Sequence, residues 1–155
     1  MAIVLADLLE EDRVTLEVRA QSRDEALREI VGTMGGAGAV EETAKFLAEV
    51  RAREEVHTTF MGNGVAFPHS RTALVSTIVL GIGRSRAGVP FGEKGELAHL
   101  IFVVGVPLRM VKDYLVCVGA LARLTKDDEN RAALMSSATP NEFVTLLREA
   151  SLLLE

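Results

Sequence analysis

The sequence predicts a single α/β domain over residues 1–155, in which a mixed β-sheet is sandwiched between helices. Two apolar segments, 75–83 and 99–106, support this prediction, and the second is hydrophobic enough to be buried on both faces. Segments with helical spacing lie before and after these strands, so helices can cover both faces of a sheet. The length suits one core, and 48% hydrophobic residues can fill it.

The first predicted elements are a strand and two helices. Residues 14–18 (VTLEV) alternate apolar and polar side chains, as a half-buried strand does. Ser22 and Glu25 have the spacing of a capping box that opens a helix, and 35-GGAG-38 ends that helix. A second helix is expected over about 41–54. Its expected inward residues are Ala44, Leu47, Ala48 and Val50.

The second half begins with the two apolar strands. The turn-rich segment 87–96 separates them, and Pro107 ends the second strand. Three helices are expected after that proline. They are 111–124, a short helix capped by Asp127 or Asp128 that runs through Met135, and a last helix capped by Thr139 that runs from Pro140 to about Glu149.

Composition and charge argue against several classes of protein. Seventeen Lys and Arg against 22 Asp and Glu give a net charge of −5 without a basic cluster, which argues against a nucleic-acid partner. Cys117 is the single cysteine, lies in an apolar segment, and is expected to be a buried small hydrophobe. Without a basic N-terminal segment or a long apolar run, the chain is expected to be cytoplasmic, with no direct membrane insertion.

The segment 62-GNGVAFPHS-70 concentrates residues with special backbone preferences before one histidine. Gly62 and Gly64 permit positive φ angles, and Asn63 tolerates the left-handed region. Such a turn can direct successive N–H groups at an anion. The proline before His69 fixes its own φ and restrains the residue before it, so the imidazole follows in a stiff segment.

The residue types around His69 suit phosphoryl transfer. A neutral imidazole is a nucleophile near pH 7, and the guanidinium groups of Arg53 and Arg71 match the geometry of a phosphate. An ordinary turn followed by a surface or core histidine is the alternative reading of this segment. Ser70 beside the histidine does not establish a hydrolase triad, and three histidines without ligand spacing predict no metal site.

The string 53-REEVHTTFMGNGVAFPHSR-71 resembles the phosphorylation-site signature of the enzyme IIA domains of the bacterial phosphoenolpyruvate-dependent phosphotransferase system. The fructose/mannitol type, which includes the nitrogen-regulatory IIA proteins, is the most similar class. The resemblance implies that His69 accepts phosphate from the histidine-containing phosphocarrier protein, with Arg53 beside it. It places Thr58 and Thr59 at the hydroxyl positions next to the site, and it implies no metal or organic cofactor.

Two positions depart from that family pattern. Tyr114 stands where many members carry a second histidine, and Phe60 stands where glycine is usual. Three functions therefore stay open. The favoured one is a regulatory phosphoryl carrier of the nitrogen-regulatory type acting on a target protein. The others are a sugar-specific IIA that passes phosphate to a fructose/mannitol-type IIB domain, and a IIA-like binding module that is not phosphorylated.

Overall fold

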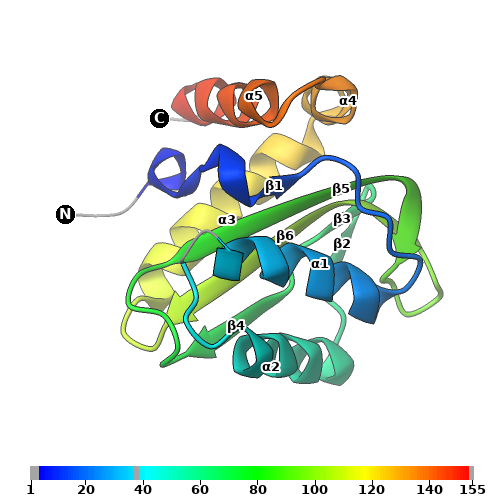
Figure 1. Ribbon diagram of the computed structural model, residues 1–155. Coiled ribbons are helices and arrows are strands. Elements are labelled where there is room, and N and C mark those ends of the chain that lie inside the picture. Colours follow the sequence, from blue (N-terminus) through cyan, green and yellow to red (C-terminus); the bar gives the residue numbers. More distant parts are fainter. Residues whose placement is uncertain (1–3, 37–38, 154–155) are drawn as a thin grey trace.

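A mixed β-sheet forms the middle layer of the fold, and helices cover both of its faces (Figure 1). The computed structural model describes residues 4–36 and 39–153. The strands in this part of the chain are β1 (Val14–Thr15), β2 (Phe60–Gly62), β3 (Val65–Ala66), β4 (His69–Thr72), β5 (Val79–Pro90) and β6 (Leu97–Pro107). They form one sheet in the order β1-β5-β6-β3-β2, with β4 also paired to β6. This arrangement confirms the predicted fold class.

The helices begin where the sequence predicts them. They are α1 (Arg23–Gly36), α2 (Thr43–Val56), α3 (Val111–Lys126), α4 (Asp128–Ser136) and α5 (Pro140–Leu152), preceded by the short 3-10 helices η1 (Leu5–Leu8) and η2 (Glu11–Arg13). The side-chain oxygens of Ser22, Asp127 and Thr139 accept hydrogen bonds from the backbone N–H three residues further on, at 3.2, 3.0 and 3.1 Å. These three caps are therefore confirmed. Residues 37–38 of the predicted stop after α1 lie outside the described residues.

Strand β6 is the centre of the sheet and the reference for the site. It pairs antiparallel with β5 and parallel with both β3 and β4. Val65 lies opposite Leu100 and His69 lies opposite Val104, so the segment 65–72, which contains β3 and β4, follows β6 along its length. Because a parallel partner fixes this segment residue by residue, the histidine has a defined position on the sheet.

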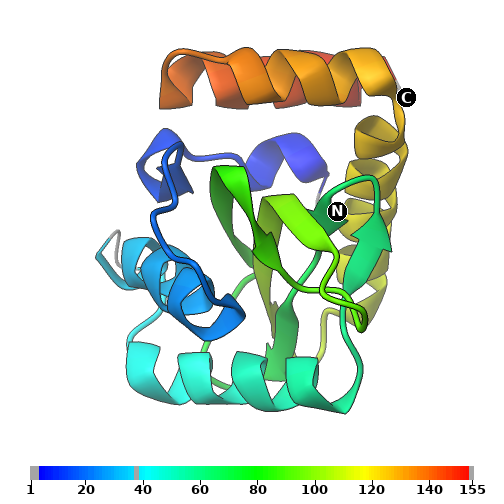
Figure 2. The same cartoon turned by 90° about the vertical axis from the view of Figure 1, so that its right-hand side faces the viewer.

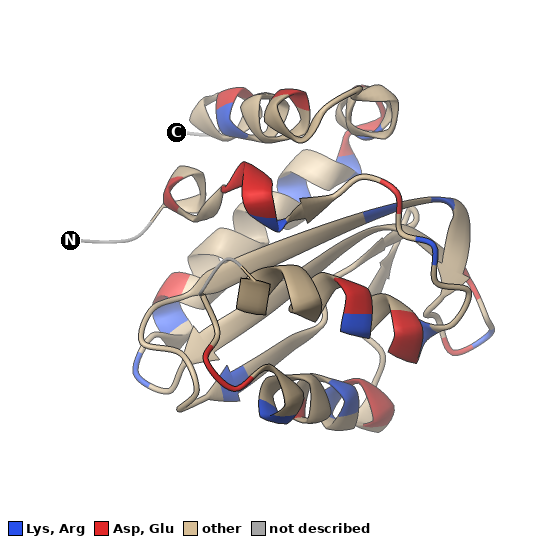
Figure 3. Cartoon of the chain, in the orientation of Figure 1, with Lys and Arg blue, Asp and Glu red and all other residues tan. Residues whose placement is uncertain are grey.

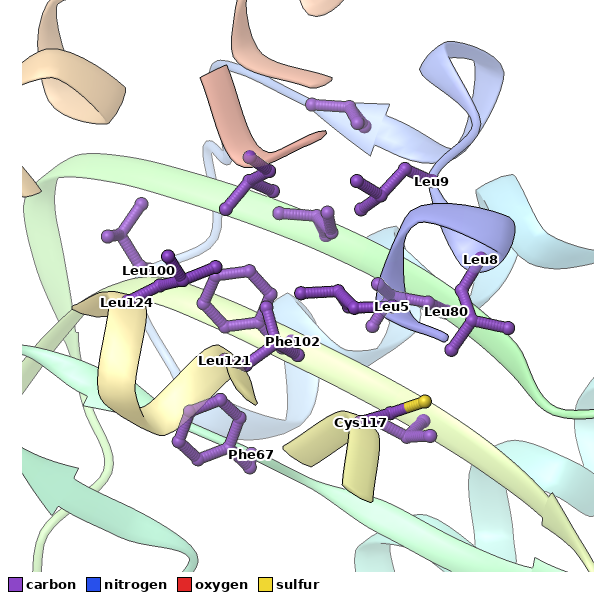
Figure 4. Packing of buried hydrophobic residues seen from close by; sticks show 14 of the residues in the cluster. Leu5, Leu8, Leu9, Phe67, Leu80, Leu100, Phe102, Cys117, Leu121 and Leu124 are labelled. Carbon is purple, nitrogen blue, oxygen red and sulfur yellow. The ribbon is translucent and has the colours of Figure 1, made fainter. Parts of the chain in front are cut away.

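The two faces of β6 pack into two separate cores. Phe102 faces a core built with α3, α5 and η1, part of which Figure 4 shows, and its ring stacks on Phe67 at 5.5 Å between centroids. Ile101, one residue away, faces the core built with α1 and α2. Figure 2 shows these two helices on one side of the sheet and α3 on the other. The alternation explains why β6 reads as a continuous apolar run.

The prediction for the first long strand was wrong at both ends. Strand β5 covers Val79–Pro90 instead of 75–83, so residues 87–90 of the expected turn-rich segment are strand. Arg84, which follows the predicted end, lies in the middle of the strand and is only 2% exposed. Its guanidinium donates to three backbone carbonyls at 3.1, 2.9 and 2.8 Å, which allows a charged side chain inside the fold. Strand β1 is likewise shorter than the predicted 14–18.

The predicted inward face of α2 was wrong for its two alanines and right for Val50, which is fully buried. Ala44 and Ala48 are exposed, and the buried stripe consists of Phe46, Val50 and Glu54. These three residues are four apart, so they lie on one side of the helix.

Charged residues of both signs are interspersed over the helices and loops, while β6 carries no lysine, arginine, aspartate or glutamate (Figure 3). None of the helices in the described part of the chain is long and apolar enough to cross a bilayer.

Candidate functional site

One pocket collects four of the predicted site residues from three elements. Arg53 comes from the end of α2, His69 and Arg71 come from β4, and Tyr114 comes from the first turn of α3. The pocket has a volume of about 310 Å³, and its lining is completed by Ser70, Val106 and Val111. The structure therefore brings together side chains that are far apart in the sequence.

The orientation of His69 is set by a backbone carbonyl two residues before it. Its Nδ1 lies 3.1 Å from the Phe67 carbonyl oxygen. A carbonyl can only accept, so Nδ1 carries the hydrogen and Nε2 carries the free lone pair. Burial lowers the pKa of His69 below its ordinary value of 6.5; the charge of Arg53 also lowers it, while the Phe67 hydrogen bond and Glu54 oppose the shift. The ring is therefore neutral and nucleophilic at pH 7.

Two neighbours of the imidazole can act on an anion bound there. Arg53 uses Nη1 to donate to the His57 carbonyl at 2.8 Å, and its other N–H groups are available to an oxyanion. The ring of Tyr114 lies 5.2 Å from the ring of His69, between centroids. Burial raises the pKa of Tyr114, against an opposing effect of Arg53, so its hydroxyl stays a donor at neutral pH. Arg71 is exposed at the rim.

The threonine pair and the glycine turn lie outside this pocket lining. The hydroxyls of Thr58 and Thr59 bind Glu54 at 2.9 and 2.7 Å. The turn Gly62, Asn63 and Gly64 has three consecutive positive φ angles, of 87°, 54° and 74°, as its residue types predict. It joins β2 to β3 and lines two other pockets, next to α3 and α4.

Sequence reasoning missed two carboxylates of α2 that bind the strands under the site. Glu54 is 2% exposed and accepts hydrogen bonds from the threonine pair, and Glu49 accepts one from Ser70 Oγ at 2.8 Å. The signal for Glu54 was available, because it continues the spacing of Phe46 and Val50 and precedes two adjacent threonines. The signal for Glu49 was absent, since nothing in the sequence pairs it with residue 70.

The remaining singled-out residues are structural. His99 uses Nδ1 to bind the Ser85 carbonyl at 2.8 Å, and His57 is exposed, 3.6 Å from Glu93. Cys117 is buried, and burial raises the pKa of its thiol to about 11. A thiol with so high a pKa is a poor nucleophile, so the expected core role of this cysteine is confirmed.

Comparisons with known proteins place the chain in a family. Residues 7–150 match the family model described as "Phosphoenolpyruvate-dependent sugar phosphotransferase system, EIIA 2". The 2-O-alpha-mannosyl-D-glycerate-specific EIIABC component of Escherichia coli K12 is 30% identical over 146 residues, which are 92% of this chain and 22% of that protein. The mannitol-specific phosphotransferase enzyme IIA component of Staphylococcus aureus N315 is 27% identical, and the match covers 94% of this chain and 99% of that one. The chain thus spans less than a quarter of two EIIABC relatives: 22% of the Escherichia coli component and 23% of the fructose-specific EIIABC component of Bacillus subtilis.

Solved structures share the fold at low identity. The nitrogen regulatory protein IIA-Ntr of Neisseria meningitidis superimposes with a TM-score of 0.78 at 24% identity, over 92% of this chain and 98% of that one. IIA mannitol of Escherichia coli gives 0.78 at 21% identity, over 90% and 98%. The family match over residues 7–150, together with this fold, identifies the chain as a member of the EIIA 2 family of the phosphoenolpyruvate-dependent sugar phosphotransferase system.

Proposed function

We propose that the chain is a phosphoryl carrier in which Nε2 of His69 accepts a phosphoryl group from the phosphorylated histidine-containing phosphocarrier protein. The Nδ1 hydrogen bond to the Phe67 carbonyl carries this proposal, because it leaves the lone pair on Nε2. In the transfer, that lone pair forms a new N–P bond while the N–P bond of the donor breaks. The donor imidazole keeps the electron pair of the broken bond, so no metal or organic cofactor enters the step.

The pocket supplies the positive charge that this transfer requires. Arg53 and Arg71 flank His69, and guanidinium groups bind the equatorial oxygens of a transferring phosphoryl group. Tyr114, whose ring lies 5.2 Å from that of His69 between centroids, offers a neutral donor. Thr58, Thr59 and the Gly62–Gly64 turn act indirectly in this scheme, through the strands that they position.

The proposal is tested by the intact mass of the protein after incubation with phosphoenolpyruvate, enzyme I and the phosphocarrier protein. Wild type should gain one acid-labile phosphate, and His69→Ala should gain none. His57→Ala is the matched control, since this histidine is exposed on the segment that leads to the same site. An unmodified wild type, with donors shown to be charged, would reject the carrier function and leave the binding module.

The fate of the phosphate separates two further readings, of which we favour the regulatory one. Phosphorylation adds about −1.5 to −2 charges at the pocket mouth, which is enough to make or break an interface with a target protein. Tyr114 supports this reading, because a tyrosine cannot become the cationic partner that a second histidine provides during onward transfer. The phosphate would then stay on His69 as a signal.

Sugar transport is the second candidate, and one observation favours it. The match to the mannitol-specific component covers 99% of that protein, and its identity of 27% exceeds the 24% of the nitrogen-regulatory structure. Phosphorylated protein should therefore be mixed with purified fructose- and mannitol-type IIB domains. Rapid transfer to one of them would establish the sugar-specific carrier, whereas phosphate that stays on His69 would favour the regulatory one.

A further inference from the structure

Glu54 is a buried carboxylate to which the proposed transfer assigns no role. It is 2% exposed at the inner side of α2, and every group bound to its two oxygens is a hydrogen-bond donor. Thr59 donates its backbone N–H to Oε2 at 2.8 Å and its hydroxyl to Oε1 at 2.7 Å. The hydroxyl of Thr58 lies 2.9 Å from Oε2 and divides its single proton between Glu54 and the Phe91 carbonyl.

These bonds continue without a break to the ring of His69. The carbonyl of Thr59 accepts the backbone N–H of Phe67 at 3.2 Å. The carbonyl of Phe67 then accepts Nδ1–H of His69 at 3.1 Å. Glu54 is therefore connected to the imidazole through Thr59 and Phe67. Thr59 is hydrogen-bonded to Glu54 and to Phe67, and Phe67 is hydrogen-bonded to Thr59 and to His69.

The backbone of Phe67 is anchored on two sides. The β3 ladder ends at Ala66, and beyond Phe67 the carbonyl of Pro68 accepts the N–H of Val104 on β6 at 2.9 Å. On the other side, the N–H of Phe67 is bound by the carbonyl of Thr59. Because Glu54 holds both the N–H and the hydroxyl of Thr59, it fixes this second anchor.

We propose that Glu54 is a positioning residue for phosphoryl transfer. It holds Thr59 and, through it, the Phe67 carbonyl, and so keeps the proton of neutral His69 on Nδ1. This inference rests on the proposed function for its kinetic consequence, but its structural consequence concerns the unphosphorylated ring alone. Glutamine has the shape of glutamate, yet its amide has one oxygen and directs an NH₂ group at donors. Glu54→Gln should therefore loosen this line of hydrogen bonds with little change of volume.

The experiment is ¹⁵N NMR of the histidine rings at pH 8, where His69 is neutral, on wild type and Glu54→Gln. Long-range ¹H–¹⁵N correlations distinguish the two tautomers. Wild type should show only Nδ1–H for His69, and Glu54→Gln should show a mixture with Nε2–H. Glu55→Gln is the matched control, because this neighbouring carboxylate is exposed. Glu49→Gln tests the route, since it breaks a different bond from α2 to β4 and should leave the tautomer unchanged.

Phosphorylation kinetics complete the test. The initial rate with charged phosphocarrier protein should fall about tenfold in Glu54→Gln, which corresponds to about 1.4 kcal/mol of barrier, and stay unchanged in Glu55→Gln. A folded Glu54→Gln protein with a pure Nδ1–H tautomer and the wild-type rate would overturn the inference. If that variant does not fold, Thr59→Val tests the same inference, because it removes only the bond from the Thr59 hydroxyl to Glu54. It should give a smaller fraction of Nε2–H and a smaller loss of rate, and no change in either would overturn the inference. Wild type that shows Nδ1–H but accepts no phosphate would refute the proposed function alone.

Discussion

Gly83→Ala should destabilise the protein because α1 lies directly against β5 at this position. A methyl group there would lie 2.5 Å from Cδ1 of Ile30, 2.8 Å from its Cγ1 and 2.8 Å from Cγ2 of Val18. Carbon atoms prefer separations of about 3.5–4.0 Å, so the neighbours must move by about 1 Å. Ile30 is fully buried and cannot swing into solvent. Overpacking of this kind costs about 1–3 kcal/mol.

The assay is urea denaturation followed by circular dichroism, with Gly32→Ala as the control. Gly32 lies on the exposed side of α1 and has no atom within 4 Å of an added methyl group, so alanine there should stabilise the helix by about 0.5–1 kcal/mol. The two variants should therefore move the free energy of unfolding in opposite directions. In a thermal scan, Gly83→Ala should lower Tm by about 2–4 °C per kcal/mol. Equal stability of the two variants would refute the close packing of α1 on β5.

Four other predictions concern the site and its support. Since burial lowers the pKa of His69 below 6.5, the initial rate of phosphorylation should fall on acidification with its midpoint below pH 6.5. The folded protein favours neutral His69, and this stabilisation is complete above pH 6.5 and lost as the pH falls through the lowered pKa of the folded state. The free energy of unfolding should therefore fall more on acidification in wild type than in His69→Ala. Parallel plots of this free energy against pH would contradict the prediction. Tyr114→Phe keeps the ring but removes its hydroxyl, and should shorten the half-life of the phosphohistidine about 2–10-fold in a mass-spectrometric time course, whereas an unchanged half-life would exclude a hydrogen bond to the phosphate. Arg84→Met removes three hydrogen bonds to backbone carbonyls and should lower the free energy of unfolding by about 3 kcal/mol or more; a loss below about 1 kcal/mol in urea denaturation would contradict that role.

The layers of the fold could be predicted because local signals agreed with the tertiary structure. Capping residues such as Ser22 and Thr139 act within one turn of the chain, and the apolar run of β6 needs only burial on both faces. The positive φ angles of the glycine turn follow from residue type alone. Each of these features is decided by neighbours in the sequence.

The parts that were not predicted depend on hydrogen-bond partners that the sequence pattern does not pair. Arg84 reads as the end of a strand until the carbonyls of Leu134 and Ser137 are placed against it. Glu54 continues the buried spacing of its helix, but a carboxylate is acceptable there only because Thr59 supplies two donors. For the same reason, the motif pointed to His69 but could not show that Phe67 selects its tautomer. A buried polar group becomes acceptable only with its partners, and the sequence does not name them.

The pocket around His69 draws residues from every layer of the molecule. Arg53 belongs to α2 on one face of the sheet, His69 to the sheet itself, and Tyr114 to α3 on the other face. A chain that has docked only one of these helices lacks part of the pocket. Under the proposed function, a growing chain would hold its phosphate with the full set of pocket residues only after α3 had left the ribosome. The half-life of phosphate taken up during synthesis would then report whether the two helical layers have closed on the sheet.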